Sequence, residues 1–113
     1  MNILNQDKIN DLARDIGDEN VPILLDIFLG ELSSYIEILT SSDNAKAMTN
    51  LAEISHALKS SAASFGAEKL CAYAVEVDNK VKLNQQIDAD IDLMAMVELL
   101  QETRVKYLGL VSQ

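Results

Sequence analysis

The single histidine of this 113-residue chain, His56, lies among small side chains and one lysine at helical spacing. On an α-helix, Ala52, Lys59 and Ser60 lie one turn from His56 on the same face, and Ala63 lies two turns on. A neutral imidazole nitrogen is a nucleophile near pH 7, and small neighbours leave it open to another macromolecule. If the imidazole accepted a phosphoryl group, the Lys59 cation would neutralise the charge of the product. The pattern therefore predicts a phosphoacceptor histidine with a supporting lysine.

The second ring nitrogen of His56 needs a hydrogen-bond acceptor that fixes the tautomer of the ring. Glu53 is on the same predicted helix but points toward a neighbouring face. If the helices on either side of Gly66 pack antiparallel, His56 lies at the level of Glu76 to Asp78, to within about one turn. We therefore predict Asp78 as the candidate partner of the imidazole.

Other patterns that could support chemistry are weaker. A lone surface histidine is more often a solvated side chain than a functional one, and this interpretation is the alternative to phosphotransfer. One histidine and one cysteine, Cys71, almost exclude a helical-bundle enzyme with paired Glu-x-x-His metal motifs. Asp88, Asp90 and Asp92 lack the turn glycine and closing glutamate of a calcium loop, so we interpret them as helix caps and helix-end charges. The glycines stand apart, which argues against a phosphate-binding loop, and we expect no metal and no cofactor.

Apolar residues recur every three or four positions along the chain, which is typical of an all-helical protein. The pattern predicts one short helix and four longer ones, over residues 9–16, 21–39, 48–65, 67–81 and 93–111. Asp88 or Asp90 is expected to cap the last of them. Four long helices with short links suit an antiparallel up-down four-helix bundle. We expect a single domain over residues 1–113, with the short N-terminal helix capping one end.

The chain has 18 acidic and 9 basic residues, a formal net charge of −9. That balance argues against binding of nucleic acid through phosphate contacts and against anionic membrane surfaces. The charge is uneven, because residues 1–43 have a net charge of −7, residues 44–86 of +1 and residues 87–113 of −3. The segment with His56 is thus the one that is not acidic. Neither a membrane span nor a signal peptide is visible, and one cysteine gives no sign of an oxidising compartment, so we expect a cytoplasmic protein.

Residues 56–67, HALKSSAASFGA, resemble the motif of histidine phosphotransfer (HPt) domains, which reads His, any residue, Leu, Lys, Gly, small residues, an apolar residue and Gly. Residues 20–31 and 53–56 resemble quorum-sensing phosphorelay proteins of that family. The resemblance implies that His56 accepts a phosphoryl group from the receiver-domain aspartate of a hybrid sensor kinase and passes it to the aspartate of a response regulator. It also implies a monomer without kinase or phosphatase activity of its own, for which the partner receiver domain supplies Mg²⁺.

The family motif implies a role for each matching residue. His56 corresponds to the phosphoacceptor, Lys59 to the residue that neutralises and orients the phosphohistidine, and Gly66 to the residue that ends the helix and allows the turn. Several members have a glutamine near the level of Asp78 that bonds the second imidazole nitrogen. Ser60 departs from the usual glycine, and its hydroxyl can either crowd the phosphoryl group or hydrogen-bond to it.

Docking of a receiver domain requires an accessible surface around the imidazole. Ala63 stands where members often have glycine, but its small side chain should preserve access. We expect this surface to include Ile9, Leu12, Ala52 and the start of the helix over residues 21–39. A binding-only protein of the same fold, which docks a receiver without chemistry, is a further alternative.

Overall fold

The computed structural model describes residues 1–41 and 43–111, which form five α-helices and no strand. The helices are α1 (Gln6–Ile16), α2 (Val21–Ser41), α3 (Asn44–Ser64), α4 (Glu68–Lys82) and α5 (Met94–Val111). Two short elements precede longer helices, namely the 3₁₀ turn η1 (Asp18–Asn20) and the π-helical turn η2 (Ala89–Leu93). The all-α fold class is confirmed, and each predicted helix is present within a few residues of its predicted bounds.

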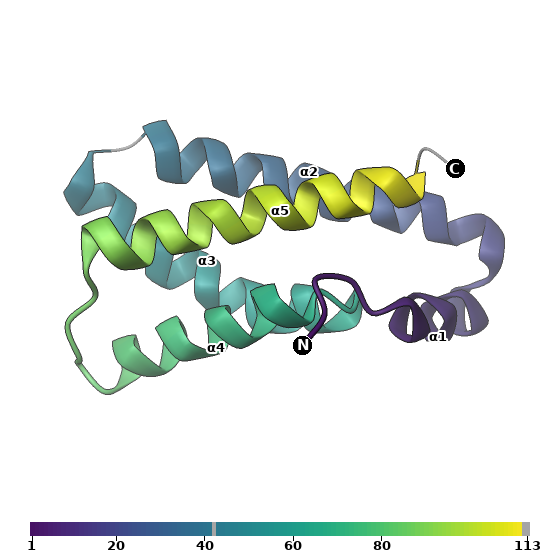
Figure 1. The fold of residues 1–113 in the computed structure, drawn as a ribbon, viewed down its shortest axis with the longest axis horizontal. Coiled ribbons are helices and arrows are strands. Elements are labelled where there is room, and N and C mark those ends of the chain that lie inside the picture. Colours follow the sequence, from purple (N-terminus) through teal and green to yellow (C-terminus); the bar gives the residue numbers. More distant parts are fainter. Residues whose placement is uncertain (42, 112–113) are drawn as a thin grey trace.

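Figure 1 shows the four long helices lengthwise beside one another, with the chain reversing at each link. The most extensive contacts join α3 to α4 and α2 to α5. α1 lies at the end of the molecule where α2 begins, which agrees with the expected position of a capping helix (Figure 1). None of the helices in residues 1–41 and 43–111 is both long enough and apolar enough to cross a membrane.

Aspartate side chains set where two of the helical segments begin. Asp43 accepts a hydrogen bond from the backbone N–H of Lys46 at 2.9 Å, in the first turn of α3. Asp88 accepts from the N–H groups of Asp90 and Ile91 at 2.8 and 3.1 Å, in the first turn of η2. Such bonds satisfy amide groups that a helix start leaves free. Asp88, and not Asp90, is thus the capping residue at the start of the last helical segment.

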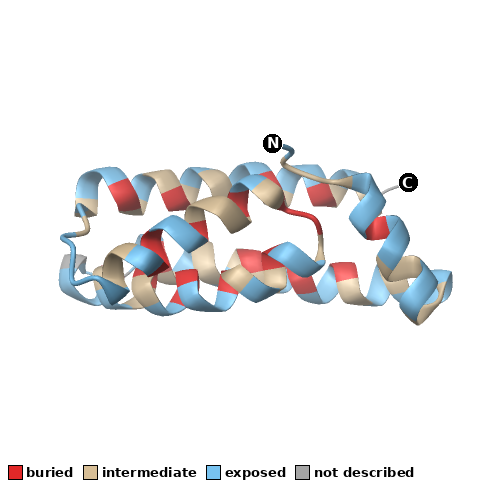
Figure 2. Ribbon diagram, turned by 90° about the horizontal axis from the view of Figure 1, so that it is seen from below, coloured by how far each residue is buried: buried red, intermediate tan, exposed pale blue. Residues whose placement is uncertain are grey.

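Buried apolar side chains from all five helices form one core, and Figure 2 shows buried positions along the length of the bundle. The rings of Phe28 and Phe65 stack with centroids 4.5 Å apart, and Tyr107 meets Phe28 edge-on at 5.2 Å. The Tyr107 hydroxyl donates to the backbone carbonyl of Phe65 at 2.6 Å. These contacts join α2 and α5 to the end of α3. Other large, fully buried core residues are Leu32, Leu51, Leu58, Leu70, Val77, Met96 and Leu100.

The link between α3 and α4 matters for the site because it sets the register of the two helices. Gly66 in this link has a φ of +76°, and the N–H of Ala67 donates to the carbonyl of Ala62 at 2.9 Å. The N–H of Asn5 donates to the Gly66 carbonyl at 2.8 Å. A Cβ at position 66 would lie 2.8 Å from the Asn5 carbonyl oxygen and 2.8 Å from Cβ of Lys8. Gly66 therefore permits both the left-handed turn and the close approach of the N-terminal segment.

Candidate functional site

His56 lies on the exposed face of α3 and turns one ring nitrogen toward α4. Its side chain is 68% exposed, whereas the side chain of Asp78 on α4 is 5% exposed. Nδ1 of His56 is 3.2 Å from Oδ1 of Asp78. The predicted contact between the imidazole and Asp78 is therefore present, and the α3–α4 hairpin is what creates it.

Two lysines neutralise the buried carboxylate of Asp78. Nζ of Lys59 on α3 is 2.7 Å from Oδ2 of Asp78, and Nζ of Lys82 on α4 is 2.9 Å from the same oxygen. The ion pairs with Lys59 and then Lys82 hold the pKa of Asp78 well below its usual range; burial opposes this shift, and the hydrogen bond from His56 adds to it. Asp78 in turn raises the pKa of Lys82. We call these four residues, His56, Lys59, Asp78 and Lys82, the His56 cluster.

The charge of Asp78 determines which nitrogen of His56 carries the proton. With its pKa lowered by the two lysines, Asp78 is ionised at neutral pH and can only accept a hydrogen bond. Nδ1 of a neutral His56 must therefore be the donor, which leaves the lone pair of the ring on Nε2. Nδ1 faces Asp78 and the His56 side chain is 68% exposed, so Nε2 is the nitrogen that an incoming molecule can reach.

The His56 cluster offers a nucleophilic nitrogen at the surface with two cations nearby. This combination suits an incoming phosphoryl group, whose negative charge the cations can balance as it transfers. Among residues 1–41 and 43–111, no three His, Cys, Asp or Glu side chains are grouped as ligands for a metal ion.

The other residues predicted near the phosphoryl site lie at different distances from it. Ser60 is exposed and Ala52 is half-buried, each one turn from His56 on α3, and Ala63 is exposed two turns on. Gly66 lies ten positions beyond His56, which is about 15 Å along the helix axis. Its near neighbours belong to the N-terminal segment. Gly66 therefore supports the hairpin from a distance and is not a neighbour of the imidazole.

The expected docking surface needs a correction at α1. Ile9 is 6% exposed and belongs to the core, so it is not available to a partner, and Leu12 is half-buried. A short helix depends on packing of its apolar stripe for stability, which is why α1 turns this face inward. The first turns of α2 instead present Ile23 and Ile27, which are 58% and 63% exposed.

Sequence reasoning did not place Lys82 in the site. Asp78 and Lys82 are four positions apart on α4, a spacing at which helical side chains meet, so the signal was present in the sequence. Such pairs are common on helix surfaces and usually contribute little. What distinguishes this pair is the burial of Asp78, and burial is a property of the packed bundle.

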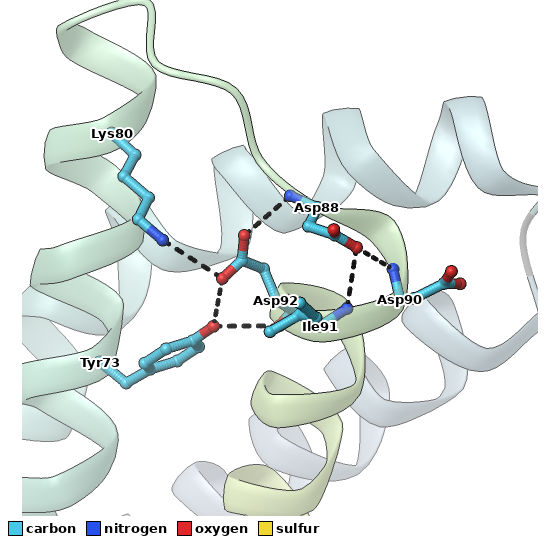
Figure 3. A network of polar contacts seen from close by, with 6 residues as sticks. All are labelled: Tyr73, Lys80, Asp88, Asp90, Ile91 and Asp92. Carbon is cyan, nitrogen blue, oxygen red and sulfur yellow. Dashed lines mark hydrogen bonds and ion pairs between the residues drawn. The ribbon is translucent and has the colours of Figure 1, made fainter.

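A second buried carboxylate, Asp92, joins η2 to α4 (Figure 3). It accepts a hydrogen bond from the Tyr73 hydroxyl at 2.8 Å and from the N–H of Asp88 at 2.8 Å, and it pairs with Nζ of Lys80 at 3.4 Å. Burial raises the pKa of Asp92, but the bonds from Asp88, Tyr73 and Lys80 outweigh it and hold the pKa below its ordinary value. The interpretation as a helix-end charge is therefore incomplete for Asp92, which also ties two segments together.

Comparison with known proteins agrees with this geometry. The sequence model of the Hpt domain family matches residues 23–106. The phosphorelay protein LuxU of Vibrio cholerae is 53% identical over 96% of this chain and 96% of its own length. LuxU of Vibrio harveyi is 51% identical over 93% of this chain and 92% of its own length.

The fold is also similar to a solved structure, that of histidine-containing phosphotransfer protein B from Pseudomonas aeruginosa PAO1. The TM-score is 0.80 over 97% of this chain and 95% of the other, at 18% sequence identity. The chain therefore belongs to the Hpt domain family and, within it, to the LuxU phosphorelay proteins.

Proposed function

We propose that this chain is a phosphorelay protein of quorum-sensing two-component signalling, in which His56 carries a phosphoryl group between two receiver domains. The donor is the receiver aspartate of a hybrid sensor histidine kinase, and the acceptor is the receiver aspartate of a response regulator. The protein acts in the cytoplasm as a monomeric, antiparallel up-down four-helix bundle, without kinase or phosphatase activity of its own. The observation that carries the proposal is the exposed imidazole of His56, whose Nδ1–Asp78 contact leaves Nε2 free to react.

In the transfer step, the lone pair of Nε2 attacks the phosphorus of the aspartyl phosphate. The N–P bond forms as the P–O bond to the receiver aspartate breaks, and the aspartate leaves as a carboxylate. Nε2 has no proton to lose, because the ring proton stays on Nδ1, where Asp78 accepts its hydrogen bond. Attack by the second receiver's aspartate reverses these events and regenerates the neutral ring. The step therefore requires no separate general base.

The receiver domain and this chain contribute different groups to the transfer. The receiver domain brings the Mg²⁺ that phosphoryl transfer normally uses. This chain contributes the nucleophile, the Lys59 cation and an open surface. Residues 44–86 have a net charge of +1 within a chain of −9, which favours approach to the acidic pocket around a receiver aspartate.

The variant His56→Gln tests this function because it removes the nucleophile and keeps a good helix former. We expect a receiver domain carrying radioactive phosphate to label the wild-type protein and to leave the variant unlabelled. Helix content, measured by circular dichroism, should be the same in both. The label on the wild type should be lost in acid and retained in alkali, as expected of an N–P bond. Labelling of the variant at the wild-type rate would contradict the proposal.

A binding-only function is separated by the same pair of proteins. Titration calorimetry with the receiver domain measures docking independently of transfer. If a receiver binds both proteins and labels neither, the chain docks without chemistry.

Measuring transfer against every receiver domain of the source organism identifies the donor and the acceptor. We expect at least one receiver of each kind.

A further inference from the structure

Lys59 is already engaged before any phosphoryl group arrives. Its ammonium group is 2.7 Å from Oδ2 of Asp78, and its side chain is 29% exposed. Lys82 reaches the same oxygen at 2.9 Å from the other helix of the hairpin. One carboxylate oxygen therefore has two cations, which is more than the neutralisation of a single charge requires.

Phosphorylation of His56 would add negative charge that one of these cations must balance. A phosphoryl group brings about two negative charges to Nε2. Lys59 is the lysine one helical turn from His56 on α3, so it is the cation that can move to the phosphoryl oxygens. Its departure would deprive Asp78 of one partner, and the Asp78 side chain is only 5% exposed. An unpaired carboxylate at such a position is strongly unfavourable.

We propose that Lys82 is a positioning residue that keeps Asp78 neutralised while Lys59 changes partner from Asp78 to the phosphoryl group. This inference rests on the proposed function of His56 and adds a positioning residue to the same site. In the free protein, both lysines share Asp78. In the phosphorylated protein, Lys59 faces the phosphoryl group and Lys82 alone holds Asp78, so each anion has a cation.

The geometry supports this exchange in two further ways. Lys82 lies four positions from Asp78 on the same helix, so it can hold the carboxylate without any movement between α3 and α4. Asp78 uses its other oxygen, Oδ1, for Nδ1 of His56. The bond that orients the ring is therefore independent of which lysine occupies Oδ2, and the ring keeps its orientation in both states.

The variant Lys82→Gln tests the exchange. Without Lys82, Lys59 remains held by Asp78 and stabilises the phosphohistidine less. We expect the equilibrium between phosphorylated protein and phosphorylated receiver to shift toward the receiver by about fivefold, the effect of one partly exposed ion pair. The half-life of the isolated phosphohistidine should fall as well. Lys82→Arg retains a cation at Asp78 and should restore both quantities.

Lys69→Gln is the matched control, because it removes the same charge from the same helix at an exposed position distant from Asp78. We expect it to leave the equilibrium and the half-life unchanged. Circular dichroism melting of each variant measures any loss of folding separately.

The background Asp78→Asn distinguishes positioning from direct contact with the phosphoryl group. With no carboxylate at position 78, Lys59 is not restrained, and adding Lys82→Gln should have no further effect on the equilibrium. A wild-type equilibrium in Lys82→Gln would overturn the proposal. So would a shift of the equilibrium as large when Lys82→Gln is added to Asp78→Asn as when it is added to the wild type. Both outcomes require that His56 is labelled in the wild type, so they are distinct from failure of the proposed function, in which no label appears.

Discussion

At the scale of single residues, the site depends on a buried carboxylate beside an exposed imidazole. Asp78 holds the ring through Oδ1 and two lysines through Oδ2. In the proposed transfer, this carboxylate therefore links the protonation of the His56 ring to the lysines that balance the charge of the product. A glutamine at this level, as the family resemblance implies for several members, could orient the ring but could not form ion pairs with the lysines, because its amide has no charge.

The variant Lys59→Ala separates the lysine's catalytic contribution from its structural one. Asp78 keeps Lys82 at 2.9 Å, so we expect the helix content to be unchanged. The phosphohistidine loses the cation on its own helix, and its half-life should fall roughly tenfold, as for a lost hydrogen bond to a charged group. The effect should exceed that of Lys82→Gln, because in the proposed exchange Lys59 is the lysine that contacts the phosphoryl group. Loss of label in alkali-quenched time courses measures the half-life, and a wild-type value would contradict this role.

Much of the site could be predicted from the sequence, because helix geometry fixes which side chains share a face. The contacts that depend on packing between segments could not be predicted. The spacing of His56 and Lys59 is fixed by helix geometry, which a sequence reveals directly. Asp78 could be reached through the register of a hairpin about Gly66. The roles of Lys82 and Asp92 could not, because they depend on burial of a carboxylate against a neighbouring segment. Apolar periodicity likewise marks Ile9 as part of a stripe without saying whether core or partner covers that stripe.

At the scale of elements, the α3–α4 hairpin determines whether the His56 cluster forms at all. The register of the two helices is set at Gly66, where a positive φ coincides with the close approach of the N-terminal segment. Periodicity predicts all five helices, since each has an apolar face toward the core. It does not predict the turns η1 and η2, because their hydrogen bonds follow other spacings than those of the α-helix. The turn η2 depends in addition on its cap, Asp88.

The variant Gly66→Ala tests the hairpin. A Cβ at this position meets the Asn5 carbonyl oxygen at 2.8 Å, and the left-handed backbone is itself unfavourable for alanine. We expect the free energy of unfolding to fall by roughly 2 to 4 kcal/mol, measured by urea denaturation. The control is Gly109→Ala within α5, where nothing lies within 4 Å of the added Cβ. This control should stabilise the protein by about 0.5 to 1 kcal/mol, and equal stabilities of the two variants would contradict the role of Gly66.

At the scale of the whole molecule, the exposed carboxylates and the buried carboxylates have opposite effects on stability as the pH falls. The chain has a net charge of −9 at pH 7, and protonation of exposed carboxylates relieves their mutual repulsion. Asp78 and Asp92 behave differently, since their partners hold both pKa values below the ordinary range in the folded protein. As the pH falls, protonation of the exposed carboxylates should therefore raise the free energy of unfolding, whereas protonation of Asp78 and Asp92 should lower it.

The pH dependence can be tested with Asp92→Asn. A carboxyl whose pKa is lowered by folding contributes stability above its unfolded pKa, which is about 3.9, and loses it as the pH falls toward the folded pKa. At pH 7, we expect the variant to be less stable by about 2 kcal/mol, because Tyr73 and Lys80 lose a charged partner. This difference should persist from pH 7 to about pH 5 and shrink below about pH 4.

Urea denaturation of wild type and Asp92→Asn at a series of pH values measures the difference. Asp90→Asn is the control, because the Asp90 side chain is exposed in the same turn, while its backbone N–H still donates to Asp88. We expect that control to change stability little at any of these pH values. If the deficit of Asp92→Asn stayed constant down to about pH 3, titration of Asp92 would not contribute to acid unfolding, and the loss of stability would have to come from Asp78 and the other carboxylates.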